Sequence, residues 1–353
     1  MSKKRLRVGV IGTGAIAVQR HLPYWQELET EGRVELVGVC DPVRDRAIAA
    51  QEKFGAKKAF ARYRQMIEND RYDIIDICTH NRWHCPITVD ALNAGAHVLV
   101  EKPMAMSVKE AAAMLSAARK ARRKLMVAQH MRFEPPHEKL KEVAERGTLG
   151  RIYTAGAVWL RRRGIPGWGR FHIRRESLGG PLIDIGVHMM DLCVWLMGFP
   201  KPKSVLGKVY RMFGDRPDLV NAGWGEPYPP REFDVEDYAI ALVRFEGDIT
   251  MRVEVSWAAN IPEEYNEVRV LGDRAGLSTN PLGVFGYQKK ALTSSRFDWL
   301  PREGGHRGEV RHFTECVERD LPVRVKPEES LVIQKIIDAI YESSKRNKEV
   351  LIP

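Results

Sequence analysis

The chain has 353 residues, which is enough for about two domains with a substantial core. Its hydrophobic fraction of 44% and charged fraction of 29% are typical of a soluble globular protein, and no apolar run approaches the roughly 18 residues that cross a bilayer. The net charge of +10 is spread among 46 acidic residues without a nucleic-acid-binding motif, so we expect neither a nucleic-acid partner nor a membrane partner.

The first residues and the cysteines favour a cytoplasmic protein. The start "MSKKRLRVGVIGTG" is basic like a signal peptide, but its apolar run is short, interrupted by glycine and not followed by a cleavage site. The five cysteines are widely spaced and never form a C-x-x-C pair. This pattern predicts neither a disulfide framework nor a zinc site, and we therefore expect a reducing compartment and no metal.

The first predicted strand, residues 6–11, ends in the pattern G-x-G-x-x-A, and a helical stretch follows towards Glu31. A strand, a tight glycine turn and a helix place backbone amides where they can hold a pyrophosphate. Gly12 makes the turn, Gly14 leaves room for a phosphate, and Ala17 allows the helix to pack closely on the strand. The motif predicts cofactor contacts from Gly12, Gly14, Ala15 and Ile16.

The second predicted strand, "VELVGVCD", ends at Asp41, an acid that can accept hydrogen bonds from an adenosine ribose. The interval from Gly12 exceeds the usual spacing of about 20 residues, which we attribute to a longer first helix and its loop. Asp41 favours NAD over NADP because a carboxylate repels a 2'-phosphate, whereas Arg44 nearby could soften that preference. A helix N-cap beside Pro42 is the alternative role for Asp41.

Three further strands are predicted at 73–79, 97–103 and 125–131, with helical stretches between them. Strands that alternate with helices predict a parallel, doubly wound sheet whose ligands lie at the carboxyl ends of the strands. The polar residues just after these runs are therefore candidates for the site: Thr79, Asn81, His84, Glu101, Lys102, His130 and Arg132.

The second half of the sequence contains long β-rich runs, which predict a second domain. We therefore place the domains at 1–130 and 131–353. The β-rich runs indicate a large, mostly antiparallel sheet. A Gly/Pro-rich loop, 214–234, is long enough to contact the substrate or a second subunit. A last amphipathic helix, about 327–346, could pack back on the first domain. The runs are "IYTAGAVWL", "KSVLGKVYRM", "DYAIALVRFE", "ITMRVEVSWAA" and "NEVRVLG".

The stretch "GGPLIDIGVHMMD", residues 179–191, carries Asp184 and His188 among apolar residues. A buried polar group without a partner costs several kcal/mol, so each needs a partner or a reaction. Residues four apart share a helix face, which places Asp184 beside His188, with Asp191 near the same face.

In their order and spacing, several segments together resemble the glucose-fructose oxidoreductase, inositol dehydrogenase and rhizopine-catabolism (Gfo/Idh/MocA) family. The resemblance covers almost the whole chain. It implies a Rossmann domain, a C-terminal α/β domain on an open sheet, NAD(P)-dependent oxidation of a sugar, polyol or cyclitol, and a homodimer or homotetramer. The segments are the glycine motif, "GVCD", "CTHNRWH", "EKPMA", "GGPLIDIGVHMMD", "GDRAG" and "SLVIQKIIDAIYESSKRN".

The resemblance also implies that Lys102, Asp184 and His188 occupy catalytic positions. A histidine suits removal of the hydroxyl proton, and an ammonium stabilises the developing alkoxide, so we assign these roles to His188 and Lys102. The alternatives are a bridge from Lys102 to Glu101, a helix cap by Asp184 and a satisfied core position for His188. His80 replaces the proline that usually precedes the family's asparagine, which puts the nicotinamide-side contacts of Asn81 and His84 in doubt.

The segment "WLRRRGIPGWGRFHIRRES" offers aromatic surfaces for a sugar ring and cations for an anionic group. It predicts that Arg163 and Trp168 line the substrate pocket; a solvated basic loop or a subunit contact is the alternative.

Two other functions stay open at this point. Some relatives hydrolyse glycosidic bonds by transient oxidation, elimination and reduction with NAD recycled, and the same Lys, Asp and His could serve that reaction. A regulatory protein that merely binds NAD is the non-enzymatic alternative, and it is weakened because all three chemical residues are present.

Overall fold

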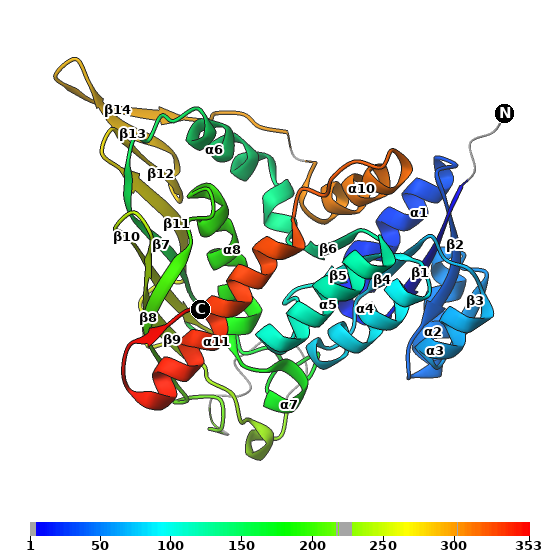
Figure 1. The fold of residues 1–353 in the computed structure, drawn as a ribbon. Helices are drawn as coiled ribbons and strands as arrows, with labels where there is room; N and C mark the ends of the chain where they lie inside the picture. Colours follow the sequence, from blue (N-terminus) through cyan, green and yellow to red (C-terminus); the bar gives the residue numbers. More distant parts are fainter. Residues whose placement is uncertain (1–4, 217, 219–227, 302) are drawn as a thin grey trace. The chain divides into compact units, whose positions relative to one another are not determined.

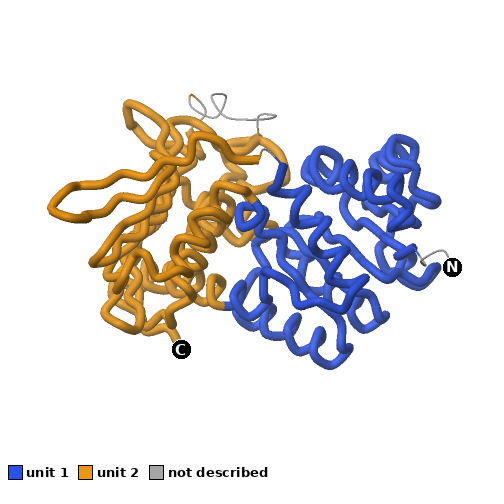
Figure 2. Tube along the Cα trace, turned by 90° about the horizontal axis from the view of Figure 1, so that it is seen from above, with its two compact units in different colours: residues 1–133, 303–331 blue, residues 134–302, 332–353 orange. Residues whose placement is uncertain are grey.

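The computed structural model describes residues 5–216, 218, 228–301 and 303–353. The chain divides into two compact units (Figure 2). Unit 1 contains residues 1–133 and 303–331, and unit 2 contains 134–302 and 332–353. The sequence predicted domains at 1–130 and 131–353, with a last helix that could pack back on the first domain. In the structure a late segment, 303–331, belongs to unit 1 and includes the start of that helix. The reason is physical: that segment contains the helix Gly305–Glu318, which packs on the first helix of unit 1.

Unit 1 is built on a parallel sheet of six strands in the order β3-β2-β1-β4-β5-β6. This order reverses direction between β1 and β4, and such a switch point is where doubly wound sheets bind their ligands. The strands are nearly continuous apolar runs because helices cover both faces of the sheet. They are β1 Leu6–Ile11, β2 Val34–Cys40, β3 Lys58–Phe60, β4 Ile74–Ile77, β5 His97–Glu101 and β6 Leu125–Ala128.

In unit 1, α1 and α10 lie side by side on one face of this sheet, and α4 and α5 lie on the other (Figure 1). Local signals set their ends: Ser107 caps α5 by accepting the Glu110 N–H at 3.2 Å, and Gly55 ends α2 with a φ of 76°. The helical segments of unit 1 are η1 Ala17–His21, α1 Leu22–Thr30, α2 Arg44–Phe54, α3 Tyr63–Asn69, η2 Asn81–Trp83, α4 His84–Asn93, α5 Val108–Ala121, η3 His130–Phe133 and α10 Gly305–Glu318.

Unit 2 is built on a sheet of nine strands in the order β14-β13-β12-β11-β7-β10-β9-β8-β15. Only the β7 and β10 pair is parallel, so the prediction of a mostly antiparallel sheet is confirmed. The strands are β7 Ile152–Leu160, β8 Pro202–Tyr210, β9 Tyr238–Phe245, β10 Ile249–Ser256, β11 Tyr265–Gly272, β12 Ala275–Thr279, β13 Leu282–Gln288, β14 Ala291–Arg296 and β15 Val350–Leu351.

Helices cover one face of this second sheet and leave the other face open. Along β9, buried and exposed residues alternate strictly, as expected for a half-covered antiparallel strand. α8 packs on β7 and β11, and α11 packs on β8 through Ser343, whose Oγ accepts the Gly207 N–H at 2.9 Å. The helical segments are α6 Pro135–Glu145, α7 Arg174–Ser177, η4 Leu182–Gly186, α8 Val187–Leu196, η5 Pro230–Glu232 and α11 Pro327–Arg346, which begins in unit 1.

The predicted fold class, a Rossmann domain followed by an α/β domain with an open sheet, is confirmed. Part of the predicted long loop, residues 217 and 219–227, lies outside the described residues. A search of the described helices found none with the length and apolar character needed to cross a membrane.

Candidate active site

The glycine turn after β1 has the geometry of a phosphate-binding turn. Gly12 has a φ of +93°, and a Cβ there would lie 2.4 Å from the Cys78 carbonyl oxygen, so only glycine fits. A Cβ on Gly14 would meet no heavy atom within 4 Å, which leaves open space beside the first amides of the following helix. Ala15 and Ile16 begin that helix. The turn therefore fits a dinucleotide pyrophosphate.

Asp41 follows β2 and braces the glycine turn. One carboxylate oxygen accepts the Thr13 N–H at 3.0 Å, and the other accepts the Val43 N–H at 2.9 Å. Asp41 is only 6% exposed, so both of these hydrogen bonds are largely shielded from water. Arg44 is exposed in the first turn of α2. The N-cap of α2 is Val43, not Asp41.

The loops after β4 and β5 are joined by His84. Its Nδ1 lies 2.7 Å from the carbonyl oxygen of Pro103, and its Nε2 lies 3.0 Å from that of Thr79. Burial lowers the pKa of His84, and the two carbonyl contacts oppose that shift. Asn81 is buried beside this histidine in η2. His84 thus fixes the turn that carries Lys102, and its contact with the cofactor stays a prediction.

Lys102 directly follows β5, and its own backbone is held by the preceding residue. Glu101 Oε2 accepts the Lys102 N–H at 3.0 Å, and Glu101 Oε1 lies 2.9 Å from His21 Nε2. Although burial alone would raise it, the hydrogen bond and charge of His21 lower the pKa of Glu101 to about 2.

Arg132, predicted to bind substrate, is fully buried in unit 1. Its Nη1 lies 2.5 Å from Glu329 Oε2, and its carbonyl oxygen accepts from Arg324 at 3.2 Å. The guanidinium charge therefore already has a protein partner, and a substrate role for it stays a prediction.

In unit 2, Asp184 and His188 lie where a π-helical turn, η4, runs into α8. Asp184 Oδ2 accepts the indole N–H of the fully buried Trp257 at 3.0 Å, and His188 is 7% exposed. Arg161 is also buried, stacks over Trp159 at 5.1 Å and interacts electrostatically with Asp184. Burial lowers the pKa of Arg161, and Asp184 opposes that shift.

The start of η4 is capped by Glu236, not by Asp184. Glu236 Oε1 accepts the Gly180 N–H at 2.9 Å, the Leu182 N–H at 3.3 Å and the Tyr341 hydroxyl at 2.9 Å. A Cβ on Gly180 would lie 1.9 Å from the Glu236 carbonyl oxygen, so the glycine permits this close approach. Burial raises the pKa of Glu236. Asp184 is therefore not needed as the helix cap.

The arginine-rich segment, residues 159–177, contains both hydrogen-bonded and exposed side chains. Arg163 donates to the Ala259 carbonyl at 3.1 Å and to Asn260 Oδ1 at 2.9 Å, and it lies over the Phe213 ring at 5.2 Å. Trp168 is 41% exposed. Trp168 thus has partly exposed aromatic surface, whereas the Arg163 guanidinium is held by the carbonyl and amide oxygens of residues 259 and 260.

Two groups of buried side chains have metal-ligating atoms within 4.8 Å of one another: His21 with Asp76 and Cys78, and His21 with Glu101 and Glu309. Both ring nitrogens of His21 already lie 2.9 Å from carboxylate oxygens. A cation could therefore bind this histidine only by displacing a ring proton.

The sequence missed four residues that organise these sites: His21, Glu309, Glu236 and Trp257. His21 lies ten residues before the end of the predicted first helix, and Glu309 lies in a segment with no predicted element. Glu236 and Trp257 flank strands β9 and β10, which were predicted only as sheet. For Glu236, the sequence offered one signal: an acidic residue next to the start of a predicted strand.

A parallel 3-2-1-4-5-6 sheet with this glycine turn is typical of a Rossmann dinucleotide-binding domain, which here is followed by a second unit built on an open, mostly antiparallel sheet. Residues 6–129 match the oxidoreductase family with an NAD-binding Rossmann fold, and residues 137–278 match the GFO/IDH/MocA C-terminal domain. The chain belongs to the GFO/IDH/MocA family of oxidoreductases, as its motifs predicted.

Individual relatives extend over nearly the full chain. It is 32% identical to the D-glucoside 3-dehydrogenase of Escherichia coli (strain K12) over 351 residues, covering 99% of this chain and 98% of the relative. It is 26% identical to the levoglucosan dehydrogenase of Pseudarthrobacter phenanthrenivorans, covering 81% and 75%. The structure of an oxidoreductase domain protein from Kribbella flavida has a TM-score of 0.85 at 22% identity, covering 99% and 100%, and so shares the fold.

Proposed function

We propose that this protein is an NAD-dependent dehydrogenase that oxidises a secondary hydroxyl of a sugar, with Lys102, Asp184 and His188 as catalytic residues. The observation that carries the proposal is the position of Lys102, which directly follows β5 at the same sheet edge as the Gly12 turn. Ligands of doubly wound sheets bind at this edge. A cation there is placed to meet the reacting end of a bound dinucleotide.

The reaction separates a hydroxyl group into a proton and a hydride. NAD, which the Gly12 turn and Asp41 would hold, would supply the hydride acceptor. His188 accepts the hydroxyl proton, and the Lys102 ammonium stabilises the alkoxide as the C=O bond forms. Asp184, oriented by the Trp257 indole N–H, accepts a hydrogen bond from a neighbouring substrate hydroxyl or orients the His188 ring. That all three groups act on one substrate is part of the proposal.

We further propose that the substrate is a glucoside-type pyranose oxidised at C3. The support is the relative named D-glucoside 3-dehydrogenase, which is 32% identical over almost the whole chain, and the relative named for levoglucosan. The exposed Trp168 offers a surface on which a sugar ring can stack. We propose NAD over NADP because the Asp41 carboxylate at the end of β2 would repel a 2'-phosphate.

A substrate screen tests this proposal. Methyl glucosides, levoglucosan, free sugars, cyclitols and aryl glycosides are incubated with NAD or NADP while nicotinamide absorbance and products are followed together. We expect stoichiometric NADH and a 3-keto glycoside. Release of aglycone without net NADH would instead establish the redox-neutral glycosidase, and no conversion of any sugar with either cofactor would contradict both enzymes.

We also propose that the protein forms a homo-oligomer through the open face of its second sheet. Large apolar side chains are exposed there on adjacent strands β8 and β9: Leu206, Tyr210, Ile240 and Leu242 are 54%, 43%, 37% and 46% exposed. Native mass spectrometry should show a dimer or tetramer that Leu242→Arg dissociates. A monomeric wild-type protein would contradict this proposal.

A further inference from the structure

A chain of buried hydrogen bonds connects helix α1 to the backbone of Lys102 within unit 1. Asp76 Oδ2 accepts the Trp25 indole N–H at 2.7 Å and lies 2.9 Å from His21 Nδ1. On the other side of the ring, His21 Nε2 lies 2.9 Å from Glu101 Oε1. Glu101 Oε2 then accepts the Lys102 N–H at 3.0 Å. His21 and Asp76 are fully buried, so water does not compete for these bonds.

When both neighbouring carboxyl groups are ionised, only the doubly protonated ring of His21 satisfies both of its hydrogen bonds. Each ring nitrogen faces a carboxylate oxygen, and a carboxylate accepts hydrogen bonds but does not donate them when ionised. A neutral ring could donate to only one of the two. Although burial lowers it, the charge and hydrogen bond of Asp76 raise the pKa of His21 well above its ordinary value.

Helix α10 closes this cluster from the opposite side. Glu309 is fully buried, and neither of its carboxyl oxygens has a hydrogen-bond partner among the described residues. Burial raises the pKa of Glu309 well above its ordinary value. His306 stacks on His130 with ring centroids 4.1 Å apart, and burial with the charge of His130 lowers its pKa to about 2. α10 thus adds two buried groups to the surroundings of His21, and burial shifts the pKa of each towards its neutral form.

We propose that His21 is a positioning residue for Lys102, and that it acts through Glu101. The imidazolium holds the Glu101 carboxylate in one orientation, and that carboxylate fixes the first backbone amide after β5. The direction of the Lys102 side chain follows from the direction of its backbone. The inference rests on the proposed catalytic role of Lys102, and it adds a residue from the cofactor-binding helix that need not touch substrate or cofactor.

Activity measurements on His21→Gln test the proposal. We expect kcat to fall roughly 10- to 100-fold, because small misplacements of a reacting group have effects of this size, while KM for sugar and NAD affinity stay within about threefold. The matched control is Trp25→Phe, which also removes a hydrogen bond to Asp76 but leaves the His21 contact with Glu101. It should lower the melting temperature and leave kcat unchanged.

If His21 acts on Lys102 through Glu101, variants of Glu101 give a second test. Glu101→Ala should lower kcat like His21→Gln, and the double variant should be no worse than Glu101→Ala alone, because residues in one chain of contacts are not additive. Fully additive losses, or an equal loss of kcat in Trp25→Phe, would show a general structural effect and overturn the proposal.

An activity-independent measurement separates this inference from the proposed function. The ring ¹⁵N signals of His21, assigned by their loss in His21→Gln, should be those of an imidazolium at pH ~8, where an ordinary histidine with a pKa of about 6.5 is neutral. The groups facing the ring are Asp76, Cys78, Glu101, Glu309 and His306.

A neutral His21 ring at pH ~8 would overturn the inference even in an active enzyme. So would a stoichiometric metal ion in the purified protein that is lost in His21→Gln, because ligation needs an unprotonated nitrogen. If the wild type shows no dehydrogenase activity while His21 is an imidazolium, the proposed function is contradicted. The inference that the His21 ring is doubly protonated is then still supported.

Discussion

At the scale of single residues, Gly12 and Gly14 do different work in the same turn. Gly12→Ala should lower the free energy of unfolding by about 1–3 kcal/mol, because the backbone of Gly12 is left-handed and a Cβ there would meet the Cys78 carbonyl. Gly14→Ala should leave stability unchanged and weaken NAD binding, because its Cβ enters open space where the pyrophosphate is expected. Thermal unfolding and NAD titration check the pair; equal destabilisation by both would contradict this division of roles.

Glu236 carries a second prediction at this scale. Glu236→Ala removes the acceptor for two backbone amides and the Tyr341 hydroxyl, leaving buried donors that cost about 1–3 kcal/mol each. We expect lower stability and lower kcat, because η4 carries Asp184. Glu236→Gln keeps an acceptor oxygen and should recover most of both. Unfolding in urea and initial rates check this, and a Gln variant as damaged as Ala would argue against the cap.

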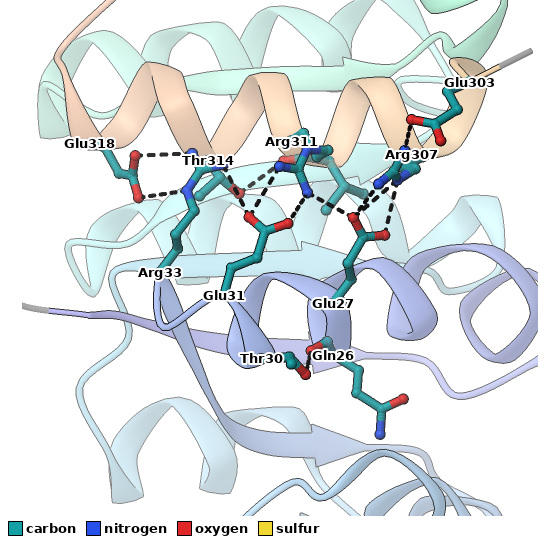
Figure 3. Close-up of polar contacts among 11 residues, drawn as sticks. Gln26, Glu27, Thr30, Glu31, Arg33, Glu303, Arg307, Arg311, Thr314 and Glu318 are labelled. Atoms are coloured by element: carbon teal, nitrogen blue, oxygen red, sulfur yellow. Dashed lines mark hydrogen bonds and ion pairs between the residues drawn. The ribbon is translucent and has the colours of Figure 1, made fainter.

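At the scale of elements, ion pairs hold α10 on α1 (Figure 3). Arg307 binds Glu27 with its Nε 2.9 Å from Oε2, and Arg311 bridges Glu27 and Glu31 at 2.8 Å and 2.6 Å. Arg33, just after α1, pairs with Glu318 at 3.0 Å. These contacts place the inner face of α10, with Glu309, against His21.

Because Arg307 and Arg311 form a network rather than an isolated pair, we expect their joint replacement by Ala to cost more than the roughly 0.2–1 kcal/mol of one surface pair. The cost should shrink at high salt. Hydrogen bonds from Arg307 lower the pKa of Glu27 in the folded state, so the contribution is present above the unfolded pKa near 4.5 and is lost as the pH falls through the folded value.

The control for that network is Arg319→Ala, which removes an exposed pair between the residue that follows α10 and Glu315 in its last turn. It should change the unfolding midpoint little at any salt concentration. Salt-independent loss in the double variant would indicate lost packing of α10 rather than lost charge.

The elements themselves were largely predictable from hydrophobic pattern. β1 and β7 and helix α11 match their predicted ranges, because each is a continuous apolar run or a strongly amphipathic helix. The short edge strands β3, β14 and β15 and the helix α10 were not predicted. β15 pairs with the distant strand β8, and α10 joins α1 through ion pairs 280 residues apart, which local pattern does not contain.

The two π-helical turns of the described structure, η1 and η4, could not be predicted from the sequence either. η1 ends at His21 and η4 contains Asp184, so each proposed site has such a turn beside it. π-turns are rare and often lie at functional sites, but they are produced by tertiary contacts rather than by a residue pattern. The motifs found Asp184 and Lys102; the partners Trp257 and Glu101–His21 became visible only in three dimensions.

At the scale of the whole molecule, the residues of the proposed site are distributed over both units. Unit 1 supplies the glycine turn and Lys102, and unit 2 supplies Asp184 and His188. The order of motifs along the chain was enough to predict this division. The place of α10 in unit 1 was not predicted, because amphipathicity shows that a helix has a partner but not which one.

The proposed function requires both Lys102, which lies in unit 1, and His188, which lies in unit 2. Lys102→Met and His188→Ala are compared with wild type for NADH formation from methyl glucoside, with NAD affinity and melting temperature measured on the same samples. We predict that each variant loses about 100-fold or more in kcat while NAD affinity and melting temperature stay close to wild type. Wild-type turnover in either folded, NAD-binding variant would contradict the claim.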